Sequence, residues 1–160
     1  MTSVSPDSSS IAPADPYVGR TAPWSNEAEQ AVLGAMLLDQ DAALRAAELV
    51  DDGMFYREPH RRLFRAMIAL TEQRVVIDHV TLRDELMRRG ELDTAGGLGY
   101  IAELVDSVPT AANLEFHAKI VREKAILRRL IETATGIVTE AYDGRTSASD
   151  LLDKAESRVF

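Results

Sequence analysis

The sequence predicts an all-α protein, in which a compact helical head is followed by a helical hairpin. Apolar residues recur every three or four positions through most of the chain, which is typical of helices with one buried face. Helix-capping residues and glycine or proline breaks separate these segments. The chain lacks a run of alternating apolar and polar residues long enough to predict a sheet, since Val75-Val76-Ile77 is too short to form one alone.

Composition limits the classes of protein to which the chain can belong. Its 160 residues are 46% hydrophobic, enough for one domain with a substantial core. The absence of cysteine excludes disulfides, thiolate metal sites and a cysteine nucleophile, and is consistent with the cytoplasm. The sequence has neither an apolar run of about 20 residues nor a secretion signal, so we expect a cytoplasmic protein with no membrane partner. A net charge of −8 argues against stand-alone DNA binding.

The head is expected to span residues 24–108, after a disordered tail at 1–23 that is rich in serine and proline. Ser25 is the predicted N-cap of the first helix, and Asp41 is the candidate cap of a second helix from Ala42 to Val50. Pro59 is expected in the first turn of a third helix. Asp78 or Thr81 is the predicted cap of a fourth helix, in which Thr81 and Asp84 form a loose capping box. A short fifth helix is predicted from Leu98 to Val105.

A long helix is predicted from about Ala112 to Tyr142, and its apolar residues form one narrow stripe. From Phe116 to Ala141 the stripe is about 39 Å long at about 1.5 Å per residue, whereas a small domain is only about 30 Å across. Part of the stripe should therefore extend beyond the head and require a partner. The stripe consists of Phe116, Ile120, Leu127, Leu130, Ile131, Ala134, Val138 and Ala141.

Glu123 falls inside this stripe. It either pairs across an interface or is neutralised locally by Lys119 or Lys124. Stripe residues also recur at a spacing of eleven, as in Phe116, Leu127 and Val138, which predicts a nearly straight helix.

The hairpin and the start of a linker are expected at 109–160. Asp143-Gly144 is the turn, and Ser147 or Ser149 caps the second arm. That arm is about 18 Å long and ends at Phe160 without a C-cap, so we expect it to be truncated. Residues 149–160 could fold back over the stripe, but they are too short to cover all of it. A continuation of the chain or a second subunit should cover the rest.

Residue patterns that carry catalysis are missing. The sequence contains no phosphate-binding G-x-x-x-x-G-K-[ST] loop and no G-x-S-x-G, and its glycine cluster at Gly96 is interpreted as a turn between helices. The three histidines lack metal-ligand spacing, and His60 is expected at the surface or against a partner. Arg128 and Arg129 are interpreted as a solvated face, with contact to a partner or to DNA as the alternative. We predict no catalytic, cofactor-binding or metal-binding residue.

Several blocks of the chain, in order, resemble the N-terminal domain of bacterial replicative DNA helicases of the DnaB type. The blocks are SNEAEQAVLGAM (25–36), FYREPHR (55–61), IDHVTL (77–82), GGLGYIAEL (96–104), PTAAN (109–113), IVREK (120–124), LRRLI (127–131) and LLDKAESRVF (151–160). The last block resembles the start of the linker to the motor domain. The resemblance covers about residue 23 to the end.

The resemblance implies that such domains pair through their helical hairpins and form a collar on a hexameric ring. The collar docks primase, and helicase loaders act on the assembly. ATP, Mg²⁺ and most contact with single-stranded DNA belong to a RecA-like motor domain, which is absent from this chain. The chain itself should not be an enzyme, although its parent would be an ATP-dependent DNA helicase.

The candidate subunit interface is the middle of the long helix. It comprises Phe116, Ile120, Glu123, Leu127, Leu130, Ile131, Ala134 and Val138. The alternative function is a free-standing helical adaptor or regulator without a motor.

Overall fold

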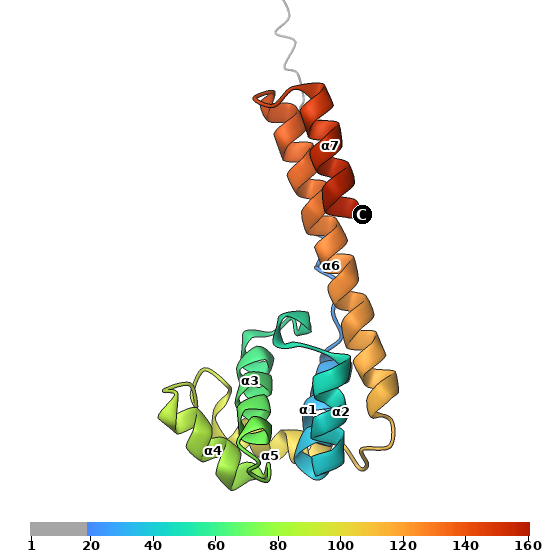
Figure 1. The fold of residues 1–160 in the computed structure, drawn as a ribbon. Helices are drawn as coiled ribbons and strands as arrows, with labels where there is room; N and C mark the ends of the chain where they lie inside the picture. Colours follow the sequence, from blue (N-terminus) through green and yellow to red (C-terminus); the bar gives the residue numbers. More distant parts are fainter. Residues whose placement is uncertain (1–18) are drawn as a thin grey trace, which may run out of the picture.

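A head of short helices carries a long arm formed by two antiparallel helices, as the computed structural model shows (Figure 1). The structure describes residues 19–160, and this part of the chain contains no strand. The all-α head and hairpin predicted from the sequence are therefore confirmed. The elements are α1 (Asn26–Leu38), α2 (Gln40–Leu49), the 3₁₀ turn η1 (Asp52–Met54), α3 (Glu58–Glu72), α4 (His79–Arg88), α5 (Gly97–Ser107), α6 (Leu114–Asp143) and α7 (Ala148–Val159).

Side-chain caps set the starts of several helices. The Ser25 hydroxyl accepts a hydrogen bond from the Ala28 N–H, as predicted for α1. The cap predicted at Asp41 is wrong, because Asp39 has the extended backbone of an N-cap and its carboxylate accepts from the Asp41 N–H at 3.0 Å. Asp41 lies instead in the first turn of α2.

The capping box of α4 is formed by Asp78 and Thr81, rather than by Thr81 and Asp84. The Asp78 carboxylate accepts from the N–H groups of Val80 and Thr81, while the Thr81 hydroxyl accepts from the Asp78 N–H. These hydrogen bonds, led by the one from Thr81, hold the pKa of Asp78 below its usual range. Both residues were candidates from the sequence, but which one is the N-cap depends on the residue at which the extended backbone ends and the helix begins.

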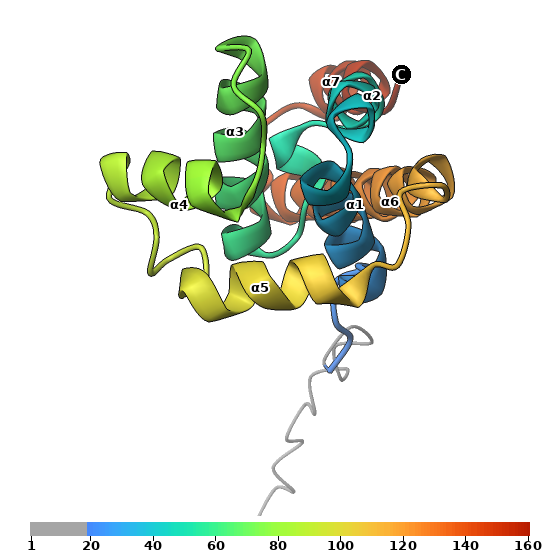
Figure 2. The same ribbon diagram turned by 90° about the horizontal axis from the view of Figure 1, so that it is seen from below.

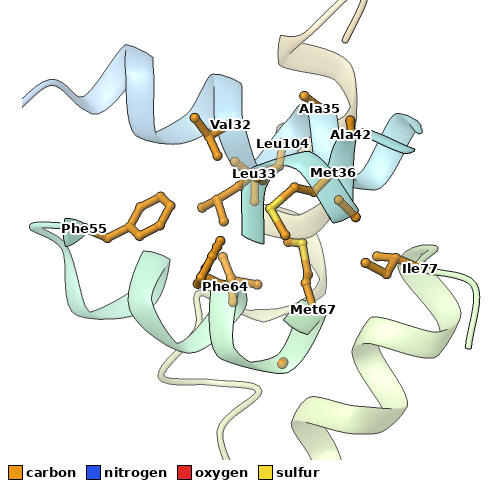
Figure 3. Close-up of a cluster of buried hydrophobic side chains, with 14 of the residues drawn as sticks. Val32, Leu33, Ala35, Met36, Ala42, Phe55, Phe64, Met67, Ile77 and Leu104 are labelled. Carbon is orange, nitrogen blue, oxygen red and sulfur yellow. The ribbon is translucent and has the colours of Figure 1, made fainter. Parts of the chain in front are cut away.

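The core of the head is built around α1, which packs against α2, α3, α5 and the first half of α6, with α5 below α1 in the view of Figure 2. Leu33 and Met36 of α1 and Phe64 and Met67 of α3 point toward one another (Figure 3), and all four are buried. Phe55, which follows η1, is fully buried beside Phe64, with ring centroids 5.0 Å apart. Phe55 thereby anchors the segment between η1 and α3 in the core.

Helices α1 and α5 touch at Gly34. A Cβ atom added there would lie 2.5 Å from Val108 Cγ2 and 2.7 Å from the Leu104 carbonyl oxygen, closer than packed atoms approach. We expect Gly34→Ala to lower the free energy of unfolding by about 1–3 kcal/mol through overpacking. Gly136→Ala is the matched control, because a Cβ there meets nothing within 4 Å and should stabilise α6 by about 0.5–1 kcal/mol. Urea denaturation of both variants checks this, and equal stabilities would contradict the packing described.

The arm is built on α6, whose 30 residues give a length of about 45 Å. Its first half packs against α1 and α2 of the head, and its second half extends beyond the head and is joined by α7 (Figure 1). The turn between them begins at Gly144, and the Ser147 hydroxyl caps α7 by accepting from the Asp150 N–H. Ser147 is therefore the cap, rather than Ser149.

Candidate subunit interface

The apolar stripe of α6 is exposed along most of its length. Phe116 is 64% exposed, Leu127 45% and Val138 54%, and Leu130, Ile131 and Ala134 are exposed as well. Ile120 differs, because it is partly buried and packs against the core. An exposed apolar surface this long on a single helix is typical of an interaction site.

The stripe faces away from the head. The residues of α6 that the head buries are Leu114, Ala118 and Val121. At about 100° per residue these lie on the side of the helix opposite Phe116 and Leu127. The head therefore uses one face of α6 and leaves the opposite face largely free, so the stripe, apart from Ile120, is not part of the core of the head.

Helix α7 packs on a third face of α6. Above the head, the partly buried residues of α6 include Thr133, Ile137 and Glu140, which recur every three or four positions, and Arg158 pairs with Glu140 at 2.8 Å. The possibility that residues 149–160 fold back over the stripe is therefore wrong. They fold back, but onto the face beside it, because Leu151 and Ala155 of α7 are the residues that become partly buried.

Glu123 is exposed within the stripe and pairs with Lys119, one helical turn earlier, at 3.9 Å. Of the two explanations considered for this charge, the structure favours local pairing. An exposed ion pair of this kind contributes about 0.3–0.5 kcal/mol or less. Glu123 therefore sits at an apolar surface without being held in one position.

Arg128 anchors the arm to the head, so its interpretation as part of a solvated face is wrong. Its guanidinium donates to the carbonyl oxygens of Pro23 and Met54, both at 2.8 Å, and lies 5.3 Å from the centroid of the Tyr56 ring. Trp24 packs on the same tyrosine, with ring centroids 5.0 Å apart. Burial, the largest cause, lowers the pKa of Arg128 from its ordinary value. This one side chain thus joins α6, η1 and the segment before α1.

A buried polar cluster, which we call the hub, lies beneath this anchor and consists of Glu29, His60 and Tyr100. His60 is fully buried, so its predicted surface position is wrong. Its Nδ1 lies 2.8 Å from Glu29 Oε1, and its Nε2 contacts the Tyr100 hydroxyl. Because that hydroxyl already accepts from Gln30 and Arg57, it donates to His60 Nε2, and His60 Nδ1–H donates to Glu29.

The hub fixes the surface on which the arm stands. The Glu29 carboxylate also accepts from the N–H groups of Tyr56 and Arg57, at 2.9 and 3.4 Å, and so holds the backbone that leads into α3. Gly96 adopts a left-handed backbone that places Tyr100 directly over it, leaving no room for a Cβ. The position of Tyr56, and hence of Arg128, depends on these contacts. In the sequence, the spacing of Glu29, His60 and Tyr100 gave no signal that they would meet.

Features that would indicate other classes of site are few in residues 19–160. No group of three or more side chains there is arranged to hold a metal ion. None of the helices is both long and apolar enough to cross a bilayer. The main surface feature of these residues is the exposed stripe of α6, on an arm that Arg128 anchors to the head.

Comparisons with known proteins agree on one family. The family model described as the DnaB-like helicase N terminal domain matches residues 21–123, well over half of the chain. The replicative DNA helicase DnaB of Rhodothermus marinus is 46% identical over 142 residues, and that of Geobacillus stearothermophilus is 44% identical over 141. These matches cover 89% and 88% of this chain but only 15% and 31% of the two relatives.

Solved structures give the same result. The N-terminal domain of DnaB helicase from Mycobacterium tuberculosis has a TM-score of 0.83 and 40% identity, over 87% of this chain and 98% of that one. The corresponding domain from Helicobacter pylori, described with its interactions with primase, shares the fold with a TM-score of 0.62, at 19% identity and over 72% of this chain and 90% of that one. The chain therefore belongs to the family of DnaB-like helicase N-terminal domains.

Proposed function

We propose that this chain is the assembly and docking domain of a replicative DNA helicase, and that the stripe of α6 pairs it with a second copy of itself. The observation that carries the proposal is the exposed stripe on the face of α6 that neither the head nor α7 uses. Burying several Leu, Ile and Val side chains against a second copy would remove them from water, at roughly 25 cal/mol per Å² of apolar surface.

Most of the stripe is spaced symmetrically about Leu127. Pairs of positions lie 4, 7 and 11 residues to either side of it, so Phe116 matches Val138, Ile120 matches Ala134, and Glu123 matches Ile131. Two antiparallel copies of α6 can therefore meet with Leu127 against its own copy and these three pairs opposite each other. The two remaining stripe residues, Leu130 and Ala141, then lie opposite Lys124 and Asn113 of the second copy. A two-fold pair of this kind is self-complementary, as in most homodimers.

Charge favours the antiparallel arrangement over a parallel one. A parallel pair would bring the two Glu123 side chains together, and the two Lys119 side chains as well. Like charges directly opposite each other are destabilising, and parallel helix dipoles repel. In the antiparallel pair each Glu123 lies opposite Ile131 of the second copy and keeps its own Lys119 as partner.

The parent protein is proposed to be an ATP-dependent helicase of the cytoplasm, with such pairs forming a collar on its hexameric ring. The two DnaB relatives named as replicative helicases support this proposal, as does the primase interaction described for the Helicobacter pylori domain. The collar would dock primase and be acted on by a helicase loader. ATP, Mg²⁺ and single-stranded DNA would be bound chiefly by the motor domain, and we propose that this chain hydrolyses no ATP by itself.

Two measurements on the purified chain test this function. Sedimentation velocity over a range of concentrations should show a reversible monomer–dimer equilibrium. Titration calorimetry with the primase of the same organism should show saturable binding. A chain that stays monomeric at the highest concentration and gives no heat with primase would contradict the proposal and favour the free-standing adaptor.

A further inference from the structure

Tyr142, at the tip of the arm, is a large aromatic side chain with almost no contact in the monomer. It is 89% exposed, although it lies in the last turn of a well-formed helix. Tyrosine combines an apolar ring with a polar hydroxyl and is over-represented among the residues that dominate binding energy. Its exposure on a rigid element is therefore a reason to look for a matching surface.

A groove of about 310 Å³ lies at the other end of α6, where the arm meets the head. Its apolar lining is Ala31, Val108 and Pro109, and its polar lining is Glu27, Gln30, Ser107, Thr110, Asn113 and His117. A groove of this size, with an apolar patch among several hydrogen-bonding side chains, suits one aromatic ring that carries a hydroxyl.

The antiparallel register brings the tip of one arm to this groove of the other copy. With Leu127 at the two-fold axis, Tyr142 of one copy lies level with Ala112 of the second, next to Asn113. At about 100° per residue, Tyr142, Asn113 and His117 all lie on the same side of the stripe. In a two-fold antiparallel pair, this flank of the stripe lies on the same side of the paired arms in both copies. Tyr142 of one copy and the groove of the other therefore face each other.

We propose that Tyr142 of each copy inserts into the groove between α1 and the start of α6 in the second copy. The two insertions are related by the two-fold axis and lie at opposite ends of the paired arms. They would fix the register of the pair, because shifting one helix by a turn would withdraw both rings by about 5.4 Å. This inference rests on the proposed self-pairing and adds the site that each tip occupies.

Crosslinking between cysteine variants tests the insertion cleanly, because the chain has no cysteine of its own. One chain carries Tyr142→Cys and the other Asn113→Cys, and a short bis-maleimide joins thiols about 10 Å apart, close to the separation of packed helices. The matched control pairs Tyr142→Cys with Glu115→Cys, which is at the same height but on the other side of α6. We expect a several-fold higher yield of crosslinked dimer with Asn113→Cys.

A second pair, Phe116→Cys with Val138→Cys, reports the antiparallel register by itself. If that pair crosslinks while Tyr142→Cys joins Asn113→Cys no better than Glu115→Cys, the insertion is overturned and the self-pairing stands. If Phe116→Cys and Val138→Cys do not crosslink in mixtures, the antiparallel pairing fails, and the insertion fails with it.

Affinity provides an independent readout. Tyr142→Ala should weaken self-association at least tenfold and leave the circular dichroism of the monomer unchanged, because the side chain is exposed. Tyr142→Phe keeps the ring and should recover most of the affinity. Unchanged self-association of Tyr142→Ala would overturn the proposal. Weaker primase binding by that variant with self-association intact would assign Tyr142 to a contact with a different protein and would overturn the proposal as well.

Discussion

Replacing Leu127 with aspartate should abolish self-association at micromolar concentrations and leave the head folded. Leu127 lies at the proposed two-fold axis, so the substitution places two carboxylates face to face in an apolar contact. An unpaired charge buried at an interface costs about 3–5 kcal/mol, which corresponds to a dissociation constant raised by roughly a hundredfold or more. Sedimentation equilibrium measures the association, and circular dichroism measures the fold.

Leu98→Asp provides the matched control for this experiment. Leu98 is the same residue type and is 53% exposed, but it lies on α5 of the head, outside the stripe. The control should dimerise like the parent chain. If Leu127→Asp unfolds the head, the stripe is part of the monomer's core. If both variants dimerise normally, the stripe is not the interface.

Replacing Glu29 with alanine should lower the free energy of unfolding of the head by about 2–4 kcal/mol. The change removes the acceptor for the partly buried N–H groups of Tyr56 and Arg57 and for Nδ1 of the fully buried His60. A buried donor left without a partner costs about 1–3 kcal/mol, and neighbouring losses in one network are not independent. Urea denaturation followed by circular dichroism provides the measurement.

Glu27→Ala is the comparison for Glu29→Ala. Glu27 lies in the same first turn of α1, but its side chain is exposed. Its loss removes only a favourable interaction with the helix dipole, about 0.3–1 kcal/mol. Similar losses for the two variants would mean that the hub does not stabilise the head. A further consequence is specific to the hub: Glu29→Ala should raise amide hydrogen exchange at Tyr56 and Arg57 more than elsewhere in the head.

The sequence was sufficient to predict the arm, because a helix has a fixed rise and turn. Those two constants place Phe116, Leu127 and Val138 on one face and give the face a length greater than that of the head. The cap at Ser25 was also predictable, since the hydroxyl acts on its own helix three residues away. The cap of α2 was misplaced at Asp41, because Asp39, an aspartate two residues earlier, has the extended backbone of the N-cap.

Contacts between residues far apart in the chain could not be predicted. Arg128 reaches a carbonyl oxygen 105 residues away, and Tyr100 meets His60 across 40 residues. Such contacts arise from packing of the whole head, and isolated polar residues in a helical pattern look the same whether they are buried or solvated. His60 and Arg128 were both expected at the surface for this reason, whereas His60 is buried in the hub of the head and Arg128 ties the arm to the head.

Antiparallel self-pairing through the stripe of α6 can be measured as one spin–spin distance. Thr139→Cys carries a nitroxide on an exposed position of α6 outside the stripe. In the antiparallel pair the two labels are separated by 24 residues along the arm, about 36 Å axially at about 1.5 Å per residue, so we expect a distance of roughly 35–50 Å. A distance below about 30 Å would indicate parallel helices only about 10 Å apart, and an absent dipolar signal would indicate no pairing. Either result would rule out antiparallel pairing through the stripe.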